Sequence, residues 1–481
     1  MDNPAKLLID LSIIALILAG VQQFRSPKGA LRGNWIAAVA LGLALLLVAL
    51  RNEIIAPRLV AALLLLGAGV GWWLARRVSM IQIPAMVALQ HGAGGIAAFL
   101  VCFIELVRDS VTAGSVHGVS GLSGLVLGAA TFSGSLVASG KLANLLSQPP
   151  RQLPGHGWWL GGAAAAVLVM SGLAAPSSGS ALVILLLMLV VVSAGVGTLV
   201  AVRIGGADMP VLISFLNATA GLAAAFAGVV IGNRLLVAAG ATVAASGSVL
   251  TIAMCKAMNR NLLAVFRGFH TPDPPHGDSF GLLPGDADSA AVASGKLALE
   301  PALGAVQACL EAESVIITPG YGMAMAQAQF EVVELARMLE AEGKSVRFAI
   351  HPGAGRMPGH MHVLLSEAEA PWDQLYDLPD INSDFAHTDL VIVVGASDVV
   401  NPAASTLPDT PISGMPILNA REAGRVLIVN LDDSPGYSGV RNLLYDLSDA
   451  ILLWGDAKES LRTLLGALSR ELDRESSPRV G

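Results

Sequence analysis

Long runs of hydrophobic residues fill the first half of the chain, from about residue 7 to residue 258, and polar residues gather in the short segments between them. Each run is close to the roughly 20 residues that a helix needs to cross a lipid bilayer. Many positions inside the runs are Gly or Ala, which let neighbouring helices approach closely in a membrane. The pattern predicts a tight polytopic α-helical membrane bundle of about nine transmembrane helices, at residues 7–24, 34–50, 58–74, 84–106, 120–137, 160–174, 181–202, 209–230 and 235–256.

The pattern changes after the ninth predicted helix. Pro, Gly, Asp and Ser dominate residues 271–296, a composition typical of a linker without a core of its own. Short apolar runs then alternate with helical patterns, which favours a soluble Rossmann-like α/β domain with a doubly wound parallel sheet. Strands are predicted at residues 315–318, 346–350, 390–394, 416–418, 426–429 and 450–454, and helices at residues 323–342, 360–369 and 457–471.

Composition supports a membrane protein with a soluble part. Hydrophobic residues make up 54% of the 481 residues and charged residues 14%, where a soluble protein has roughly a quarter charged. The net charge is -7 and no basic tract suited to nucleic acid is present. The three cysteines are widely spaced, so no disulfide framework and no metal site is expected. We divide the chain into a transmembrane domain at residues 1–262, a linker at 263–298 and a dinucleotide-type domain at 299–481.

Lys and Arg residues predict the orientation, because they accumulate on the cytoplasmic side of a membrane. Their distribution places the N-terminus outside and the soluble domain inside. The first apolar run lacks a cleavage motif and is interpreted as a retained helix. The odd-numbered connections hold Arg25, Lys28, Arg32, Arg76, Arg77, Lys141, Arg151, Arg203, Lys256, Arg260 and Arg267, and the even-numbered ones hold Arg51, Arg58, Arg108 and Arg234.

Three polar residues of the predicted bundle are candidates for a proton pathway. His91 lies well inside the fourth helix, and histidine titrates near neutral pH. The alternative is a neutral histidine that is hydrogen-bonded to a neighbouring helix, for which Asn217 in the eighth helix is the candidate partner. Asp208 precedes the eighth helix, where it marks the cytoplasmic mouth of the pathway or caps the helix.

Glycine-rich turns follow three of the predicted strands. The first, Pro319-Gly320-Tyr321-Gly322, leads into a helical pattern, and such a turn lets a phosphate approach the backbone at a helix start. Ligands of doubly wound sheets bind beyond the carboxyl ends of the strands. The three turns together therefore predict a crevice that binds a nucleotide. The other two turns are Gly395-Ala396-Ser397-Asp398 and the segment from His351 to Arg356.

Two features depart from the common dinucleotide fingerprint. Met325 stands where the third glycine of that fingerprint would fall. The second strand ends in His351, where a common dinucleotide domain has Asp or Glu to hold the ribose. The first turn taken alone is equally compatible with an ordinary connection between a strand and a helix.

Longer motifs carry a resemblance to a known family. The segments ITPGYGMAMAQAQ, HPGAGRMPGHMHVLLSEA, VGASDVVNPAA, GYSGVRN and GDAK, preceded by IGGADMP, CKAMNR and His91, closely resemble the beta subunit of the proton-translocating nicotinamide nucleotide transhydrogenases. The likeness covers nearly the whole chain. It implies an enzyme that moves hydride between NAD(H) on an alpha subunit and NADP(H) on this chain while a proton crosses the bacterial inner membrane. It also implies lipid contact, self-association within a heteromeric complex, and activity only with the alpha subunit.

The resemblance assigns roles to residues that match the family motifs. His91 and Asn217 match polar membrane residues used in proton translocation, and Asp398 matches an acidic residue of the nucleotide crevice that is linked to coupling. The matches to nucleotide-contacting segments are the pyrophosphate turn at Gly320, Tyr321, Gly322, Met323 and Ala324, the second loop at Ala354, Gly355 and Arg356, and the lid at Gly436 and Tyr437.

One segment departs from the family. Where the family has a Lys-Arg-Ser-like stretch that binds the 2′-phosphate of NADP, this chain has Asn430, Leu431 and Asp432, followed by Asp433. Two carboxylates in place of two cations repel a phosphate, so we hypothesise that the chain binds NADP(H) weakly or prefers NAD(H). Two other hypotheses are a membrane channel or transporter with a nucleotide-sensing domain, and a degenerate paralogue that binds the alpha subunit without turnover.

Overall fold

The computed structural model of the chain describes residues 4–23, 27–51, 57–108, 115–147, 151, 153–205, 208–258, 261–267, 299–408 and 410–476. The chain divides into two compact units, residues 1–253 and 254–481. Most of the predicted linker at residues 263–298 lies outside the described residues. The start of that segment belongs to the short helix α10 (Leu262–Arg267).

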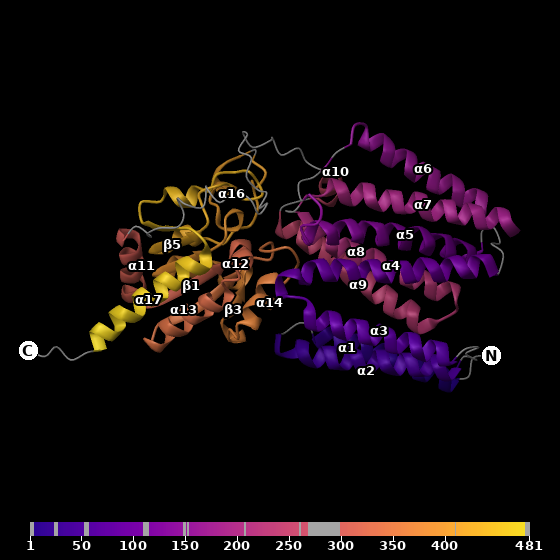
Figure 1. Cartoon of the computed structure of the whole chain (residues 1–481), viewed down its shortest axis with the longest axis horizontal. Helices are drawn as coiled ribbons and strands as arrows, with labels where there is room; N and C mark the ends of the chain where they lie inside the picture. The colour runs from indigo at the N-terminus through magenta and orange to yellow at the C-terminus, as the bar shows by residue number, and fades with distance from the viewer. Residues whose placement is uncertain are drawn as a thin grey trace, which may run out of the picture. The chain divides into compact units, whose positions relative to one another are not determined.

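Nine helices in the described part of the first unit are long and apolar enough to cross a membrane, which confirms the predicted bundle (Figure 1). Several begin earlier than the hydrophobic pattern predicts, because their first turns contain polar residues that the pattern excludes. A 3-10 turn, η1 (Met80–Gln82), precedes the fourth helix. The helices are α1 (Pro4–Gln23), α2 (Pro27–Arg51), α3 (Pro57–Arg77), α4 (Ile83–Arg108), α5 (Val116–Leu142), α6 (His156–Ala174), α7 (Gly179–Arg203), α8 (Met209–Val230) and α9 (Arg234–Ala257).

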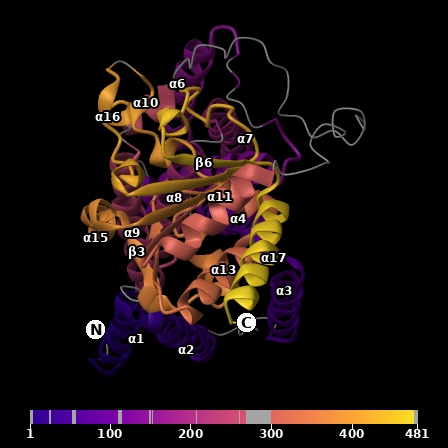
Figure 2. The same cartoon turned by 90° about the vertical axis from the view of Figure 1, so that its left-hand side faces the viewer.

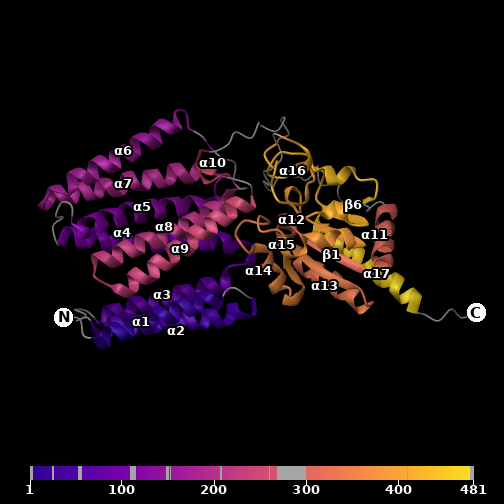
Figure 3. The same ribbon diagram turned by 180° about the vertical axis from the view of Figure 1, so that it is seen from behind.

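Helix α5 is the centre of the bundle. It packs against α4, α7 and α8, and these helices run side by side in two opposite views (Figures 1 and 3). Glycines make the closest approaches possible: a Cβ on Gly95 of α4 would lie 2.7 Å from the carbonyl oxygen of Gly128 on α5. The apolar core between these helices includes the fully buried Leu125, Leu186 and Leu189. The many Gly and Ala residues of these helices therefore produce the tight packing that the sequence predicts.

The second unit is built around a six-stranded parallel sheet in the order β3-β2-β1-β4-β5-β6, which confirms the doubly wound prediction. The strands are β1 (Ser314–Pro319), β2 (Ser345–Ile350), β3 (Leu375–Asp377), β4 (Leu390–Val394), β5 (Arg425–Asn430) and β6 (Ala450–Trp454). The helices are α11 (Leu299–Glu311), α12 (Tyr321–Ala326), α13 (Gln329–Ala341), α14 (His360–Glu367), α15 (Leu378–Ile381), α16 (Ala403–Thr406) and α17 (Ala457–Ser476).

Different kinds of element cover the two faces of the sheet. Helices α11, α13 and α17 pack against β6, β2 and β5 respectively, and they lie together on one side (Figure 2). The other face packs against α15 and short 3-10 segments, whose buried side chains include Phe385, Ala420 and Leu444. These segments are η4 (Asn382–His387), η6 (Ala420–Glu422) and η7 (Leu443–Asp446), and η3 (Trp372–Gln374) and η5 (Asp398–Val400) complete the set.

Two element predictions were wrong, and one strand was not predicted. Residues 416–418 do not form a strand, because their backbone bonds go to loop partners: the Pro416 carbonyl accepts from His351, and the Leu418 N–H donates to the Val399 carbonyl. The third strand of the sheet is instead β3, which is too short for the pattern to predict. The helix predicted at 323–342 is interrupted at Gln327, whose φ of 53° ends α12 before α13 begins.

Candidate functional site

Two glycine turns meet at the switch point of the sheet, where the neighbouring strands β1 and β4 end. The Gly320 N–H donates to the Val394 carbonyl and the Gly322 N–H to the Gly395 carbonyl, both at 2.8 Å. A Cβ on Gly320 would lie 2.2 Å from the Gly395 oxygen, and one on Gly395 would lie 2.1 Å from the backbone nitrogen of Met323. Gly395 also has a φ of 65°. The close approach of the two backbone turns therefore requires glycine at Gly320 and Gly395, whether or not a phosphate binds there.

Helix α12 begins directly in this turn. The side chains of Met323 and Ala324 are completely buried, so only the backbone of these residues is placed to contact a ligand in the crevice. The Tyr321 ring lies at the helix start, beside Arg356 and Tyr437. Its centroid is 4.6 Å from the Arg356 guanidinium carbon and 6.0 Å from the Tyr437 centroid. Three predicted site residues from distant parts of the sequence are thus brought together.

The charges in this cluster are well defined. Arg356 is only 8% exposed, so its guanidinium is a nearly buried cation at the ligand edge of the sheet. Burial first, and the neighbouring Tyr437 second, raise the pKa of the Tyr321 hydroxyl above that of an ordinary phenol. Tyr321 therefore stays neutral at physiological pH and offers the cation an aromatic face.

Asp398 holds the predicted lid segment to the turn after β4. One carboxylate oxygen accepts from the backbone N–H of Ser438 at 3.0 Å, and the other accepts from the Ser438 hydroxyl at 2.6 Å. A Cβ on Gly436 would lie 2.7 Å from this carboxylate, so the approach depends on glycine. Sequence reasoning missed Ser438, although the motif GYSGVRN contains it.

The segment after β5 contributes no cation. Asn430 is buried, and its amide Nδ2 donates to the Ala396 carbonyl at 2.9 Å and the Tyr445 hydroxyl at 2.8 Å. Leu431 is 65% exposed, and Asp432 accepts from the backbone N–H of Ser434 in a local turn. The Asn430 amide thus links β5 to the β4 turn. Leu431, Asp432 and Asp433 are all exposed, and two of the three carry carboxylates.

Two buried histidines fix the loop that carries Arg356. His351 Nδ1 accepts from the Gly353 N–H at 2.9 Å, so its Nε2 carries the hydrogen and donates to the Pro416 carbonyl at 2.8 Å. His360 Nδ1 accepts from the Arg356 N–H at 3.2 Å. Burial lowers the pKa of each ring to about 4, and the Arg356 charge also lowers that of His360. Both rings are neutral at pH 7. His351 therefore serves as a structural link where a common domain has a ribose-binding acid.

The backbone of the same loop needs its glycine. Gly355 has a φ of 100°, and a Cβ there would lie 2.6 Å from Nδ1 of His360. The neighbouring Ala354 is buried. The predicted contact residues Ala354, Gly355 and Arg356 are therefore held in one conformation by the histidine beneath them. Sequence reasoning missed His360, which the motif GRMPGH places four residues after Arg356.

Buried polar atoms without a hydrogen-bond partner collect at the ligand edge. Among the described residues, five such atoms lie at or after the carboxyl ends of β1, β2, β4 and β5: Thr318 Oγ1, the Tyr321 hydroxyl oxygen, His360 Nε2, Ser397 Oγ and Asn430 Oδ1. Buried polar groups in folded proteins are normally paired. The buried Arg356 cation, the glycine turns and these atoms fit a polar, anionic ligand such as a dinucleotide.

The membrane unit contains a second polar site, between α4 and α8. The Asn217 side chain is a hydrogen-bonding neighbour of the His91 imidazole. The Nδ1 atom of His91 is buried and has no hydrogen-bond partner among the described residues. Asp208 occupies the position before α8, but its side chain makes no capping hydrogen bond there. The structure thus brings His91 and Asn217 together and separates Asp208 from them along α8.

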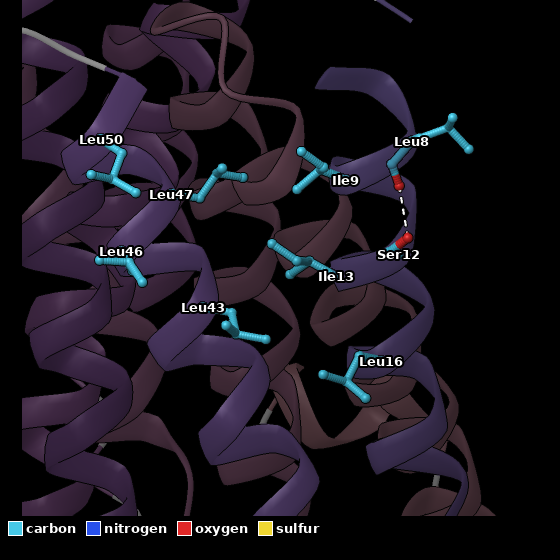
Figure 4. A pocket seen from close by; sticks show the side chains of 9 residues that line it. All are labelled: Leu8, Ile9, Ser12, Ile13, Leu16, Leu43, Leu46, Leu47 and Leu50. Carbon is cyan, nitrogen blue, oxygen red and sulfur yellow. Dashed lines mark hydrogen bonds between the residues drawn. The ribbon is translucent and has the colours of Figure 1, made fainter. Parts of the chain in front are cut away.

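Several other polar residues of the bundle form contacts between helices. Asp10, which sequence reasoning passed over, is 6% exposed and forms an ion pair with Arg51 at 2.5 Å. This pair joins α1 to α2. The groove beside it is lined by leucines and isoleucines and by Ser12, whose hydroxyl donates to the Leu8 carbonyl (Figure 4). The groove therefore offers no free polar chemistry. In the part of the chain that the structure describes, no group of three metal-ligating side chains is found.

Comparisons with known proteins agree with this arrangement. The sequence model of a family described as "NAD(P) transhydrogenase beta subunit" matches residues 7–467. The chain is 40% identical over 473 residues to the NAD(P) transhydrogenase subunit beta of Rhodospirillum rubrum, covering 95% of this chain and 99% of the relative. A protein of the same name from a specified strain of that organism gives the same values.

Proposed function

This chain belongs to the NAD(P) transhydrogenase beta subunit family, and on that premise we propose how its two units divide the work. The soluble unit binds NADP(H), an alpha subunit binds NAD(H), and hydride passes between them while a proton crosses the membrane unit. The observation that carries the proposal is Arg356 stacked on Tyr321 at the switch point of the sheet. A nearly buried guanidinium at this edge is suited to the pyrophosphate of a dinucleotide.

The protein's part in the reaction is binding, orientation and exclusion of water. A bound nucleotide supplies the hydride chemistry itself. Arg356 offsets the pyrophosphate charge, and the glycine turns at Gly320 and Gly395 bring backbone N–H groups to the ligand edge. Asp398 keeps the lid segment at Gly436 and Tyr437 over the crevice through its bonds to Ser438. The unpaired atoms of Thr318, Ser397 and Asn430 are available to a ligand's hydroxyl and amide groups.

The segment after β5 favours a second candidate, in which the soluble unit prefers NAD(H). The amide nitrogen of Asn430 is engaged within the fold, and Asp432 and Asp433 are exposed carboxylates. A 2′-phosphate near this segment would be repelled, whereas a ribose hydroxyl can donate to a carboxylate.

Equilibrium titration of the purified full chain with NADPH and with NADH separates the two candidates. Tighter binding of NADH is expected if the segment after β5 contacts the 2′ position. NADPH binding as tight as NADH binding would exclude the NAD(H) preference and leave the NADP(H) assignment standing. Absence of binding of either nucleotide would remove the soluble unit's assigned role.

The membrane unit is proposed to conduct the proton at His91. A histidine with a buried, unpartnered nitrogen beside Asn217 is suited to accepting and releasing a proton. The last turns of α3, α5, α7 and α9 each contain Lys or Arg, and so do those of α2 and α4, but the odd-numbered connections defined from the sequence hold 11 Lys and Arg residues against 4 in the even-numbered ones. This supports an orientation with the N-terminus outside and the soluble unit in the cytoplasm of a bacterial inner membrane. We expect lipid and further copies of the chain in the assembled complex.

Vesicles that contain this chain and an alpha subunit test the membrane role. Hydride transfer between the two nucleotides should acidify or alkalinise the vesicle interior, and an uncoupler should change its rate. Hydride transfer that is indifferent to the uncoupler would contradict proton coupling. Proton flux without hydride transfer would instead support a nucleotide-sensing channel, and neither activity would support a degenerate paralogue.

A further inference from the structure

Lys141 is a buried cation at the end of the central helix α5. Its side chain is 3% exposed, although the sequence pattern assigns it to a connection. The ammonium group donates to the carbonyls of Val202 and Ile204 at 2.7 Å each and to the Ala201 carbonyl at 3.3 Å. Its three N–H donors therefore have three carbonyl acceptors. All three belong to the last turn of α7 or to the residue that follows it.

The end of α7 needs such a partner. The last carbonyl groups of a helix lack the N–H partners that the regular helical pattern would supply, and they carry partial negative charge. Apolar surroundings make unpaired carbonyls costly. The Arg151 backbone N–H donates to the Val202 carbonyl at 3.2 Å, so residues before α6 meet the same turn. Lys141 supplies most of the side-chain capping that the described structure shows at this helix end.

The last turn of α5 is bonded to a second helix as well. The Ser139 hydroxyl donates to the Ala85 carbonyl of α4 at 2.9 Å. Helix α4 carries His91. On the other side, only a short segment separates Ile204 from Asp208 and the start of α8, which carries Asn217. One turn of α5 is thus bonded to the helix of His91 and to the turn that leads to the helix of Asn217.

We propose that Lys141 is a positioning residue that anchors the α7 C-terminus and thereby the turn into α8, so that Asn217 is presented to His91. The inference rests on the proposed proton role of His91. Lys141 touches neither His91 nor the nucleotide crevice. Its effect is carried by the positions of α7 and α8, and only a cation with several donors can hold the three carbonyls together.

The position of the α7 end is measured without any catalytic assay. Ile204 is 1% exposed, so an Ile204→Cys variant should react slowly with a water-soluble maleimide in the detergent-solubilised complex. Adding Lys141→Met should speed this labelling by about tenfold, because the turn loses its anchor. Lys141→Arg should restore slow labelling, and Lys141→Gln, with two donors, should fall between. Labelling of the parent protein, whose three cysteines are buried, gives the background.

The functional measurement uses the same variants with the alpha subunit in vesicles. Lys141→Met should lower proton movement per hydride transferred by about tenfold while leaving nucleotide titrations unchanged, and Lys141→Arg should restore it. Lys6→Met is the matched control, since Lys6 is an exposed lysine in the first turn of α1. It should behave as the parent in both measurements.

The outcomes distinguish this inference from the proposed function. Slow labelling and parent-like coupling in both Lys141→Met and Lys141→Gln would overturn the positioning role. Faster labelling in a complex whose parent shows no proton movement would support the anchor but remove the proton role of His91. Failure of Lys141→Arg to restore either property, in a protein that elutes as the parent does, would overturn the requirement for a multivalent cation.

Discussion

The polar site of the bundle and the crevice of the sheet both contain buried polar atoms without a hydrogen-bond partner, but for different reasons. In the bundle most hydroxyls return to a carbonyl of their own helix, as Ser214 does to Pro210 and Thr251 to Gly247. The buried Nδ1 of His91 has no partner among the described residues, and neither do the buried hydroxyls of Ser135 and Ser193. Of these three groups, the imidazole is the one suited to taking up a proton. In the crevice, unpaired atoms gather because parallel strands end at one edge. Under the proposed function, the unpartnered nitrogen of His91 serves a proton in the first region and the unpaired atoms of the crevice serve a ligand in the second.

Because the two sites differ, we expect a substitution in one of them to leave the function of the other unchanged. The largest effect is expected for His91. Replacing it in a His91→Leu variant should reduce proton movement in vesicles by roughly 100-fold, because leucine removes the imidazole that lies beside Asn217 and can carry a proton. Nucleotide titrations of the same protein should match the parent. The measurement is a pH-sensitive dye trapped inside vesicles during hydride transfer.

His156 provides the matched histidine for that experiment. One of its ring nitrogens accepts from the Leu153 N–H and the other lies 3.1 Å from the Leu199 carbonyl. A His156→Leu variant should lose stability while proton movement per hydride stays at the parent value. Equal loss of coupling in both variants would mean that an unpartnered nitrogen does not distinguish a conducting histidine from a structural one.

The second largest effect is a loss of unfolding free energy of the soluble unit at acidic pH. The pKa of His351 falls from 6.5 to about 4 on folding, so the unfolded chain binds more protons between these values. Its contribution to stability is therefore present above pH 6.5 and is lost as the pH falls toward 4. Lowering the pH from 7 to 5 should cost about 2 kcal/mol of unfolding free energy through this residue.

Urea unfolding of the soluble unit within the full chain, followed by pulse proteolysis at pH 7 and pH 5, measures that loss. A His351→Gln variant is less stable at pH 7 but should show a smaller difference between the two pH values. An unchanged difference would assign the acid sensitivity to other groups, of which His360 is the first candidate because its pKa is also lowered to about 4.

Asp398 should give an effect of intermediate size that is confined to the crevice. An Asp398→Ala variant loses both bonds to Ser438, so the lid segment should exchange its amide hydrogens about tenfold faster. A Ser438→Ala variant keeps the backbone bond and should show a smaller increase. Hydrogen exchange followed by mass spectrometry reports both, and identical exchange in all three proteins would contradict the latch.

The sequence predicted the large features because each has a strong physical period. A run of about 20 apolar residues can satisfy its backbone in lipid only as a helix, and buried strands that alternate with helices can adopt only a few topologies in water. It failed where a single contact decides. Residues 416–418 are as apolar as a strand, yet His351 binds the Pro416 carbonyl from another loop. Gln327 adopts a left-handed conformation that helical periodicity does not reveal.

Candidate site residues could be predicted from the sequence where their signal is local. Glycine turns, an intramembrane histidine and an aspartate after a strand are visible one motif at a time. The contacts of Lys141 were not, because its three acceptors lie about 60 positions away, in the last turn of α7 and at the residue that follows it. Asp10 and Ser438 were missed for the same reason, since each is defined by a partner on another segment.

The smallest effect is expected at the exposed segment after β5. A double variant, Leu431→Arg with Asp432→Ser, replaces a carboxylate with a cation without touching the buried Asn430. It should raise the affinity for NADPH relative to NADH by a few-fold at low salt, because solvent screens charges at exposed positions. The gain should shrink as salt is added. Lys and Asp substitutions at exposed positions of α17 provide the control for net charge. An unchanged ratio at every salt concentration would mean that the 2′ position of the ligand lies away from this segment, and that Arg356 is the cation that sets the preference.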